Sequence, residues 1–275
     1  MFLKIVQYII GLLAGIMLIS APETVDSSHN TESTIVVSVD TITLKQKEMR
    51  DVVVLVGTHF GNGSGTIIDR LDIDEKEVFE YRVLTNAHVI ANRIAEYVVG
   101  ADVVTGKPKI VKVNYGCSVL TFDHQTKERT RHKTRIVAES IHRDLALLSF
   151  ESSKQFAVVK LANQKMLEIV RVFDEVYAVG CQLGNSPSPT FGIVSQILTK
   201  IQDGQEYTLY TSTAHIAPGS SGGGLFKFYD GHYYLIGIPF KVDIAFNGQF
   251  FPHLSYAISM TIVNQFIDEN VVCDD

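Results

Sequence analysis

Three separated positions of this chain carry the side chains that acyl transfer requires. His88 stands in TNAHVI, Asp144 in HRDLALLSF, and Ser221 in the glycine-rich stretch HIAPGSSGGGLF. A serine hydroxyl becomes an effective nucleophile when an imidazole takes its proton, and a carboxylate must orient that imidazole and stabilise its charged form. We therefore predict that His88 is the base, Asp144 the orienting acid and Ser221 the nucleophile of one catalytic site.

The glycines around Ser221 suit a tight turn that directs backbone N–H groups at a developing oxyanion. Gly219 and Ser221 are the expected donors of this oxyanion hole. Pro218 fixes its own φ, so it either preorganises the turn or holds it in a non-productive form. On residue type alone, Ser220 competes with Ser221 as the nucleophile.

Short runs of β-branched and aromatic residues position these side chains. Runs such as DVVVLVGTHF, YRVLT and LALLSF are bounded by Gly, Asp, Asn or Pro, which is typical of an all-β sandwich or barrel. With 275 residues, 46% of them hydrophobic, the chain can form one large β domain or two smaller units. Helices are expected only at AHVIANRI, which contains His88, and at MTIVNQFIDEN near the end of the chain.

Charge and composition exclude several other functions. The net charge of −6 gives no basic footprint, so no nucleic-acid partner is expected. GNGSG at 61–65 lacks the Lys-Ser/Thr and helix of a phosphate loop, and no cofactor is expected. No metal site is expected either, because the candidate ligands have no accepted spacing. These candidates are Cys117, His124, His132 and His142.

Two further features allow more than one interpretation. Cys117, Cys181 and Cys273 contain no CxxC pair, so either two of them form a disulfide or all three are isolated buried thiols. The charged stretch 123–133 is either a solvated hairpin tip or a segment that binds a substrate or an anionic surface.

The N-terminus has the layout of an export signal. Lys4 precedes an apolar run at 9–19, and we expect residues 1–21 to be a signal peptide or signal anchor. Pro22 would follow a cut after Ala21 and makes that site poor, so cleavage and anchoring both stay open, and a buried core helix is a third interpretation. Residues 22–48 are expected to form a linker. The protein is then expected to be periplasmic, extracellular or anchored to the outer face of the membrane, and to contact the membrane only through this segment.

The order of the motifs resembles that of the trypsin-like (chymotrypsin-fold) serine peptidases. TNAH, DLALL and GSSGG occur in that family's order, together with GNGSGTIID, YAVGCQLGNSPSPTFGIVSQI and YYLIGIPF. The chain is most similar to the HtrA/DegP-type protease domain, over about residues 50–268. The family pattern Gly-X-Ser-Gly-Gly selects Ser221 over Ser220. The chain has no IVGG-type start, and no PDZ module is expected after the protease domain.

This resemblance implies two six-stranded antiparallel β-barrels with the active site between them, and protein or peptide substrates. The protease domain would cover residues 49–270, with the first barrel at about 49–160 and the second at about 170–258. A short C-terminal helix would cover about 260–270. The 56-residue separation of His88 and Asp144 is long for the bacterial group, and the extra residues are expected in a hairpin around 115–133.

The resemblance also assigns the substrate pocket. Ile216, Ile238 and Phe240 would form an apolar pocket for small or medium aliphatic side chains, and no acid is present to favour Lys or Arg. His215 would either favour an acidic side chain or be a packed, hydrogen-bonded histidine.

Two functions remain possible for this chain. The intact set of three residues favours an exported serine endopeptidase that forms an acyl-enzyme intermediate. The alternative is a catalytically silent, protease-like binding or scaffold protein whose oxyanion turn is not competent. Sequence alone leaves the oligomeric state open.

Overall fold

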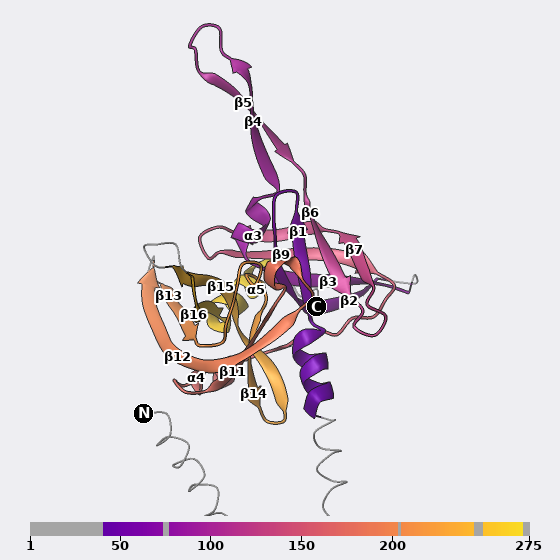
Figure 1. Ribbon diagram of the computed structural model, residues 1–275, viewed down its shortest axis with the longest axis vertical. Coiled ribbons are helices and arrows are strands. Elements are labelled where there is room, and N and C mark those ends of the chain that lie inside the picture. Colours follow the sequence, from indigo (N-terminus) through magenta and orange to yellow (C-terminus); the bar gives the residue numbers. More distant parts are fainter. Residues whose placement is uncertain (1–40, 74–76, 203–204, 245–249, 272–275) are drawn as a thin grey trace, which may run out of the picture. The chain divides into compact units, whose positions relative to one another are not determined.

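The computed structural model describes residues 41–73, 77–202, 205–244 and 250–271 (Figure 1). The chain divides into two units, Met1–Thr41 and Ile42–Asp275, and the account below concerns the second. The expected signal or anchor and most of the expected linker lie outside the described residues. Within the described ranges, no helix has the length and apolar character needed to cross a bilayer.

The first sheet contains seven antiparallel strands in the order β7-β6-β1-β2-β3-β9-β8. The strands are β1 (Val53–Thr58), β2 (Asn62–Ile73), β3 (Val78–Thr85), β6 (Cys117–Phe122), β7 (Arg129–Lys133), β8 (Arg135–Ser140) and β9 (Leu145–Ser152). The edge strands β7 and β8 do not pair with each other among the described residues. This half of the molecule is therefore a curled half-barrel and not the closed six-stranded barrel that the sequence predicted.

The second sheet closes into a six-stranded barrel. Its strands are β11 (Glu175–Gly180), β12 (Ser188–Gln202), β13 (Gln205–Ser212), β14 (Gly224–Tyr229), β15 (His232–Ile244) and β16 (Phe250–Ser259). Closure occurs because β15 pairs with both β14 and β16, and a short parallel strand, β10 (Lys160–Leu161), adds to β15. The predicted all-β, chymotrypsin-like double-barrel class is confirmed, with an open first barrel.

Short helices lie at the ends and connections of the sheets. They are the π-helical segment η1 (Gln46–Arg50), α3 (Ala87–Ala91), α4 (Gln164–Glu168), the 3₁₀ turn η2 (Gln182–Gly184) and α5 (Met260–Asn270). The expected C-terminal helix is confirmed as α5, which begins where the Ser259 hydroxyl accepts the N–H of Thr261 and buries Ile262 and Phe266. The helix at His88 is shorter than expected, because the chain enters a new strand at Ile94.

One hydrophobic core spans both sheets. It includes Leu84 and Leu147 from the first sheet and Phe226, Leu235 and Ile258 from the second, all fully buried. A core shared in this way fixes the two sheets against each other. Strand ends from both sheets can then hold side chains at defined positions along their junction.

A long hairpin leaves this core directly after α3. Its strands, β4 (Ile94–Ala101) and β5 (Pro108–Asn114), form a two-stranded sheet of their own and extend away from the other strands (Figure 1). The sequence placed the extra residues around 115–133. In the structure that stretch does form a hairpin, β6–β7, which belongs to the first sheet, and the projecting hairpin lies upstream at 94–114.

Candidate active site

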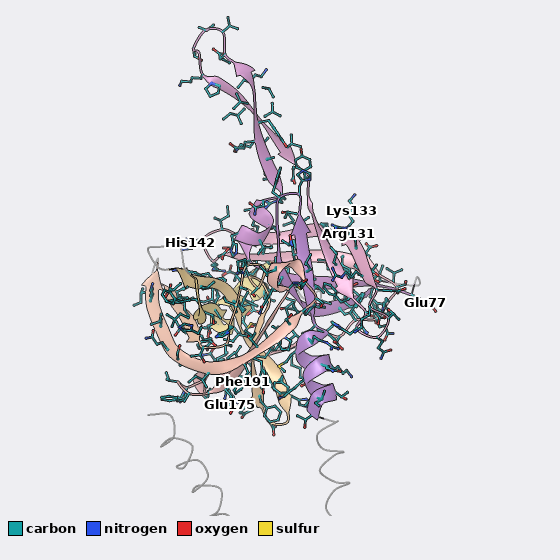
Figure 2. The ribbon with its side chains drawn as sticks, viewed as in Figure 1. Glu77, Arg131, Lys133, His142, Glu175 and Phe191 are labelled. Carbon is teal, nitrogen blue, oxygen red and sulfur yellow. The ribbon has the colours of Figure 1, made fainter. Side chains whose placement is uncertain are left out.

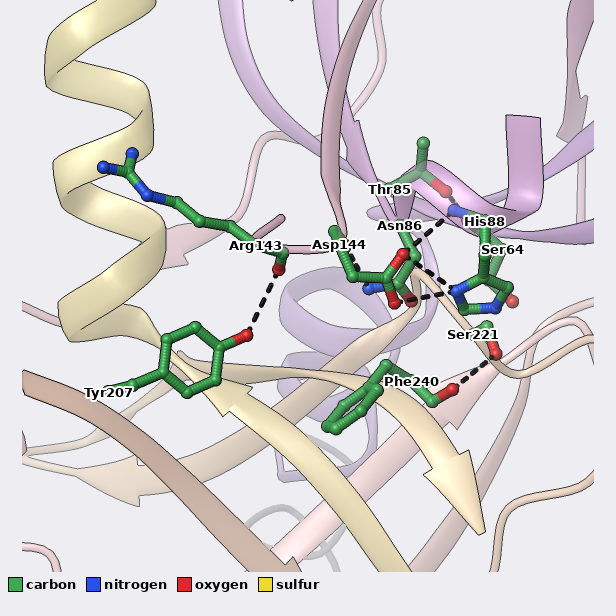
Figure 3. Close-up of polar contacts among 9 residues, drawn as sticks. All are labelled: Ser64, Thr85, Asn86, His88, Arg143, Asp144, Tyr207, Ser221 and Phe240. Atoms are coloured by element: carbon green, nitrogen blue, oxygen red, sulfur yellow. Dashed lines mark hydrogen bonds and ion pairs between the residues drawn. The ribbon is translucent and has the colours of Figure 1, made fainter. Parts of the chain in front are cut away.

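His88 is held at the junction of β3 and α3. Asn86 follows the last residue of β3 and has an extended backbone, so the helix begins at Ala87 and carries His88 in its first turn. The His88 Nδ1 lies 2.8 Å from Oδ2 and 3.0 Å from Oδ1 of Asp144 (Figure 3). The His88 backbone N–H also donates to Oδ1, at 2.9 Å. An imidazole that donates from Nδ1 to a carboxylate leaves Nε2 free to accept a proton.

Asp144 stands immediately before β9 in a left-handed conformation. Its φ of +53° is one that aspartate tolerates better than most residues. The side-chain amide of Asn86 donates to the Asp144 carbonyl at 2.9 Å and fixes the backbone there. Asp144 and His88 keep 25% and 48% of their side-chain surface exposed, so the pair is partly solvated.

The residue before Asp144 is clamped from the second barrel and α5. Both terminal nitrogens of Arg143 donate to the Glu269 carboxylate, at 2.6 and 2.8 Å. The Tyr207 hydroxyl of β13 donates to the Arg143 carbonyl at 3.2 Å (Figure 3). Burial raises the pKa of Tyr207 to about 12, and the nearby Asp144 charge adds to the rise. The phenol therefore stays protonated and able to donate.

Ser221 begins the turn that leads into β14. Its hydroxyl donates to the Phe240 carbonyl at 3.3 Å, and its carbonyl accepts the Ser64 N–H at 2.7 Å. A Cβ added at Gly63 would lie 2.6 Å from Val89 and 3.0 Å from the Ser221 oxygen. The Ser221 turn therefore packs on the start of β2 beside the helix that carries His88. No hydrogen bond joins Ser221 to His88 in the part of the chain that the structure describes.

The turn before Ser221 leaves two backbone N–H groups unused. The Pro218 carbonyl accepts the Leu183 N–H at 2.8 Å. Because the N–H and C=O groups of a trans peptide point in opposite directions, the Gly219 N–H is directed away from Leu183. Gly219 has a φ of +95°, which glycine adopts readily. Neither the Gly219 nor the Ser221 N–H donates to any described residue.

Ser220 is turned inward and is part of the loop structure. It is only 2% exposed, its N–H donates to the Ala217 carbonyl at 2.9 Å, and its hydroxyl accepts the Ala217 N–H at 3.1 Å. A hydroxyl that is buried and already bonded in this way is not accessible to a substrate. The geometry agrees with the choice of Ser221.

A buried hydroxyl ties the first sheet to the oxyanion turn. The Ser64 Oγ accepts the Cys181 N–H at 2.7 Å and donates to the Gly219 carbonyl at 2.6 Å. The Thr85 hydroxyl in turn donates to the Ser64 carbonyl at 2.7 Å. Ser64 and Thr85 are fully buried. The turn that presents the two unused N–H groups is therefore held from both sheets.

One protein family matches most of this chain. The family described as "Trypsin-like peptidase domain" matches residues 63–238, which include His88, Asp144 and Ser221. The chain belongs to this family. It is accordingly a serine-type endopeptidase.

Solved structures share the fold of this trypsin-like peptidase. The crystal structure of Deg5 superposes with a TM-score of 0.58 at 23% identity and covers 88% of this chain and 99% of its own. The HtrA-type protease AlgW, solved with a tripeptide, gives a TM-score of 0.56 at 19% identity, over 84% of this chain and 64% of its own. This chain thus spans less than two thirds of AlgW. A search of curated proteins gave no match.

The residues expected to form the peptidase's substrate pocket do not share one open surface. Ile216 and Ile238 are 4% and 0% exposed and belong to the core. His215 is exposed, and its ring centre lies 6.3 Å from that of His253. Phe240 is half-buried beside the nucleophile. The pocket assignment stays a prediction.

Sequence reasoning missed several residues that support the peptidase site. Ser64 and Asn86 stand inside the motifs GNGSG and TNAH, so the motifs themselves were the available signal. Tyr207 and Glu269 have no such local signal, because they contact Arg143 from 64 and 126 residues away along the chain.

The structure also describes two of the three cysteines. Cys117 and Cys181 are free thiols, and Cys273 lies outside the described residues. Burial raises the pKa of Cys181 to about 12, which keeps its thiol protonated.

Proposed function

We propose that this trypsin-like peptidase is an exported endopeptidase that cleaves proteins or peptides through His88, Asp144 and Ser221. The observation that carries the proposal is the pairing of His88 Nδ1 with the Asp144 carboxylate at 2.8 Å. This bond sets the tautomer that a general base needs. The unused N–H groups of Gly219 and Ser221 supply the second requirement, a pair of donors for an oxyanion.

The proposed reaction starts with a rotation of the Ser221 hydroxyl. Its 3.3 Å bond to the Phe240 carbonyl is long for an O–H donor, so little holds it there. The hydroxyl turns to His88, the Ser221 Oγ bonds to the substrate carbonyl carbon, and Nε2 takes the proton. Gly219 and Ser221 donate to the resulting oxyanion. The C–N bond then breaks, and Nε2 returns the proton to the leaving amine.

An acyl-enzyme on Ser221 remains, and water releases it. His88 Nε2 takes a proton from the water while the water oxygen bonds to the acyl carbon, and the proton then returns to Ser221 Oγ as the ester breaks. The Asp144 carboxylate stabilises the imidazolium of both steps. Pro218 has a preorganising role in this scheme, because its carbonyl is bound by Leu183 and does not block the oxyanion position.

Stoichiometric labelling with a fluorophosphonate tests the mechanism. Full-length protein should acquire one label on Ser221, located by peptide mass, and should cleave casein. Ser221→Ala should lose both activities with little change in melting temperature. Ser153→Ala removes an exposed hydroxyl after β9 and is the matched control, which should label normally. Label on any other serine would contradict the site assignment.

One observation favours the alternative, a catalytically silent protein that binds peptides. The Ser221 hydroxyl bonds to Phe240 and not to His88. If full-length protein fails to label under conditions where a known serine peptidase does, this alternative replaces the proposed enzyme.

Export rests on Lys4 and the apolar run at 9–19. The expected compartment is periplasmic, extracellular or the outer membrane face. N-terminal sequencing and the intact mass of protein from its own host test this part. An intact N-terminus on protein recovered from the cytosol would contradict export and leave the catalytic proposal standing.

A further inference from the structure

The β4–β5 hairpin exposes nearly all of its side chains. Each strand pairs only with the other, and only Ala95 and Val113 are even partly covered. Its side chains extend into solvent from both faces of the ribbon (Figure 2). An isolated two-stranded hairpin is marginally stable in water, so a hairpin this long is expected to contact something that the structure does not contain.

Apolar side chains occupy both faces of this hairpin and its tip. Tyr97 pairs with Val111 on one face, and Val98 pairs with Ile110 on the other, and all four are exposed. At the tip, Val103 and Val104 are 102% and 93% exposed. The exposed large apolar residues of the hairpin are Ile94, Tyr97, Val98, Val99, Val103, Val104, Ile110 and Val111. Eight exposed apolar side chains on one hairpin are more than scattered surface residues and indicate an interaction site.

The acidic side chain at the tip of the hairpin bonds within its own turn, which leaves two nearby lysines without an ion-pair partner among the described residues. The Asp102 carboxylate is directed into its own turn, where it accepts the Val104 N–H and the Thr105 N–H and hydroxyl at 2.7 to 3.1 Å. Lys107 and Lys109 form no ion pair with any residue in the described ranges. The end of the hairpin therefore combines two exposed valines with two free cations, on a chain whose net charge is −6.

We propose that the distal part of the hairpin, residues 98–111, docks into the surface of an anionic lipid bilayer. Val103 and Val104 enter the interface, and Lys107 and Lys109 contact the anionic headgroups. Apolar insertion beside lysines is the combination that binds anionic membranes. This contact is separate from the one expected of the N-terminal segment.

A lipid surface explains the hairpin better than a second copy of the chain does. A protein partner that adds to a ribbon covers one face or one edge, and the other face would stay exposed. The interface of a bilayer surrounds an inserted tip and covers Val98 and Ile110 on one face together with Val111 on the other. The eight residues of β4 span roughly 25 Å at about 3.3 Å each, so docking would hold the His88 helix within that distance of the bilayer.

The chain contains no tryptophan, so one introduced indole reports on its own position. We would place it at the tip with Val104→Trp, in the full chain. With vesicles of phosphatidylcholine and phosphatidylglycerol, its emission should shift to the blue and be quenched by brominated lipid chains. Ile201→Trp is the matched control, because Ile201 is 80% exposed in β12, far from the hairpin in sequence. Its emission should not change. The N-terminal segment is present in both variants, so their difference measures the hairpin.

Charge reversal tests the lysines in the same background. Lys107→Glu with Lys109→Glu should reduce the quenching several-fold, and so should vesicles of phosphatidylcholine alone, because each lysine near an anionic surface contributes to binding. Unchanged emission of the tip indole on anionic vesicles would overturn the proposal. A blue shift that grows with protein concentration in the absence of vesicles would show that a second copy covers the tip, and would overturn it too. If vesicles of phosphatidylcholine alone quench the tip indole as strongly as anionic vesicles do, anionic headgroups have no role in the binding and that part of the proposal is wrong. None of these outcomes depends on the labelling of Ser221.

Discussion

Single residues determine whether the Ser221 turn can stabilise an oxyanion. Gly219 has a left-handed φ of +95°, its N–H donates to no described residue, and the Ser64 hydroxyl donates to its carbonyl. A side chain at position 219 would have to adopt that φ and would also meet the Cys181 carbonyl at 2.6 Å. The turn is therefore constrained twice, by conformation and by space.

Gly219→Ala should abolish most of the activity and leave the fold intact. Alanine keeps the N–H, but its Cβ forces the turn to move and so displaces this donor. Loss of one oxyanion donor costs about 3 kcal/mol, so the second-order rate of fluorophosphonate labelling should fall by about 100-fold or more. Gly231→Ala is the matched control, since Gly231 has a φ of +83° and no atom within 4 Å of its added Cβ. Both variants have the conformational cost of alanine at a positive φ, and Gly219→Ala should lose somewhat more stability because its Cβ also meets the Cys181 carbonyl. Equal labelling by the two variants would mean that the Gly219 N–H has no role in the reaction.

Whole elements position the Asp144 carboxylate from across the molecule. The residue before it, Arg143, is bound by Tyr207 of β13 and by Glu269 of α5. Some of the residues that support the site lie within local sequence motifs, and others could not be predicted from the sequence. The local motifs TNAH and GNGSG contain Asn86 and Ser64, whose contacts need only a strand end or a turn. The Arg143 contacts depend on the closed second barrel, because Tyr207 and Glu269 approach from distant parts of the chain, and no local sequence pattern specifies them. No local pattern specifies either that β7 and β8 are left without a mutual pairing among the described residues.

Tyr207→Phe tests the clamp on Arg143. It removes the hydroxyl that donates to the Arg143 carbonyl and keeps the ring in place. One neutral hydrogen bond is worth about 1 kcal/mol, so kcat should fall about five-fold with KM unchanged, because Tyr207 acts on Asp144 and not on substrate. Steady-state kinetics on a fluorogenic peptide measure both constants. Tyr234→Phe, whose hydroxyl has no bond in the described residues, should have wild-type kcat. A change in KM alone would contradict a positioning role.

The η1 segment is joined to the second barrel by Glu48, which should make stability depend on pH. Its carboxylate accepts the Tyr233 N–H at 2.8 Å and pairs with His232 at 2.7 Å and Lys160 at 3.0 Å. Burial alone raises the pKa of Glu48, but these three bonds outweigh it and hold the pKa below its ordinary value of 4.5. Because the folded pKa is depressed, the stabilisation is present above pH 4.5 and is lost as the pH falls below that value.

Glu48→Gln should therefore lower the melting temperature at neutral pH and make it less sensitive to acid. Loss of the charge-assisted bonds should cost about 1–3 kcal/mol. Calorimetry over a pH series measures the effect. The control is Glu96→Gln, which removes an exposed ion pair in the hairpin and should leave the melting curve unchanged at every pH. If the melting temperatures of wild type and Glu48→Gln differ by the same amount below pH 4.5 and above it, Glu48 is not the titrating group.

At the scale of the whole molecule, the site and the β4–β5 hairpin are structurally separable. The root of the hairpin is anchored mainly by residues outside its strands: the Tyr115 N–H donates to the Arg93 carbonyl at 2.8 Å, and the Tyr115 ring stacks on His59 at 4.2 Å. Within β4, the Tyr97 hydroxyl also lies 2.9 Å from that of Tyr115. Sequence analysis expected one hairpin between His88 and Asp144, around 115–133, and the structure has two, β4–β5 at 94–114 and β6–β7 at 117–133. Both stretches, 94–114 and 115–133, have strand-like patterns, and only the pairing of β6 with β1 assigns the second to the sheet.

Replacing residues 96–112 with Asn-Gly tests this separation. The two residues fit a tight hairpin turn between Ala95 and Val113, which pair directly in the native ribbon. Fluorophosphonate labelling should keep its wild-type rate, and the melting temperature should change little, since the removed residues bury almost nothing. Cleavage of casein in solution should also persist. A ten-fold loss of labelling in a variant that still melts cooperatively would show that the hairpin supports the His88 helix, and the separation of catalysis from membrane docking would then be wrong.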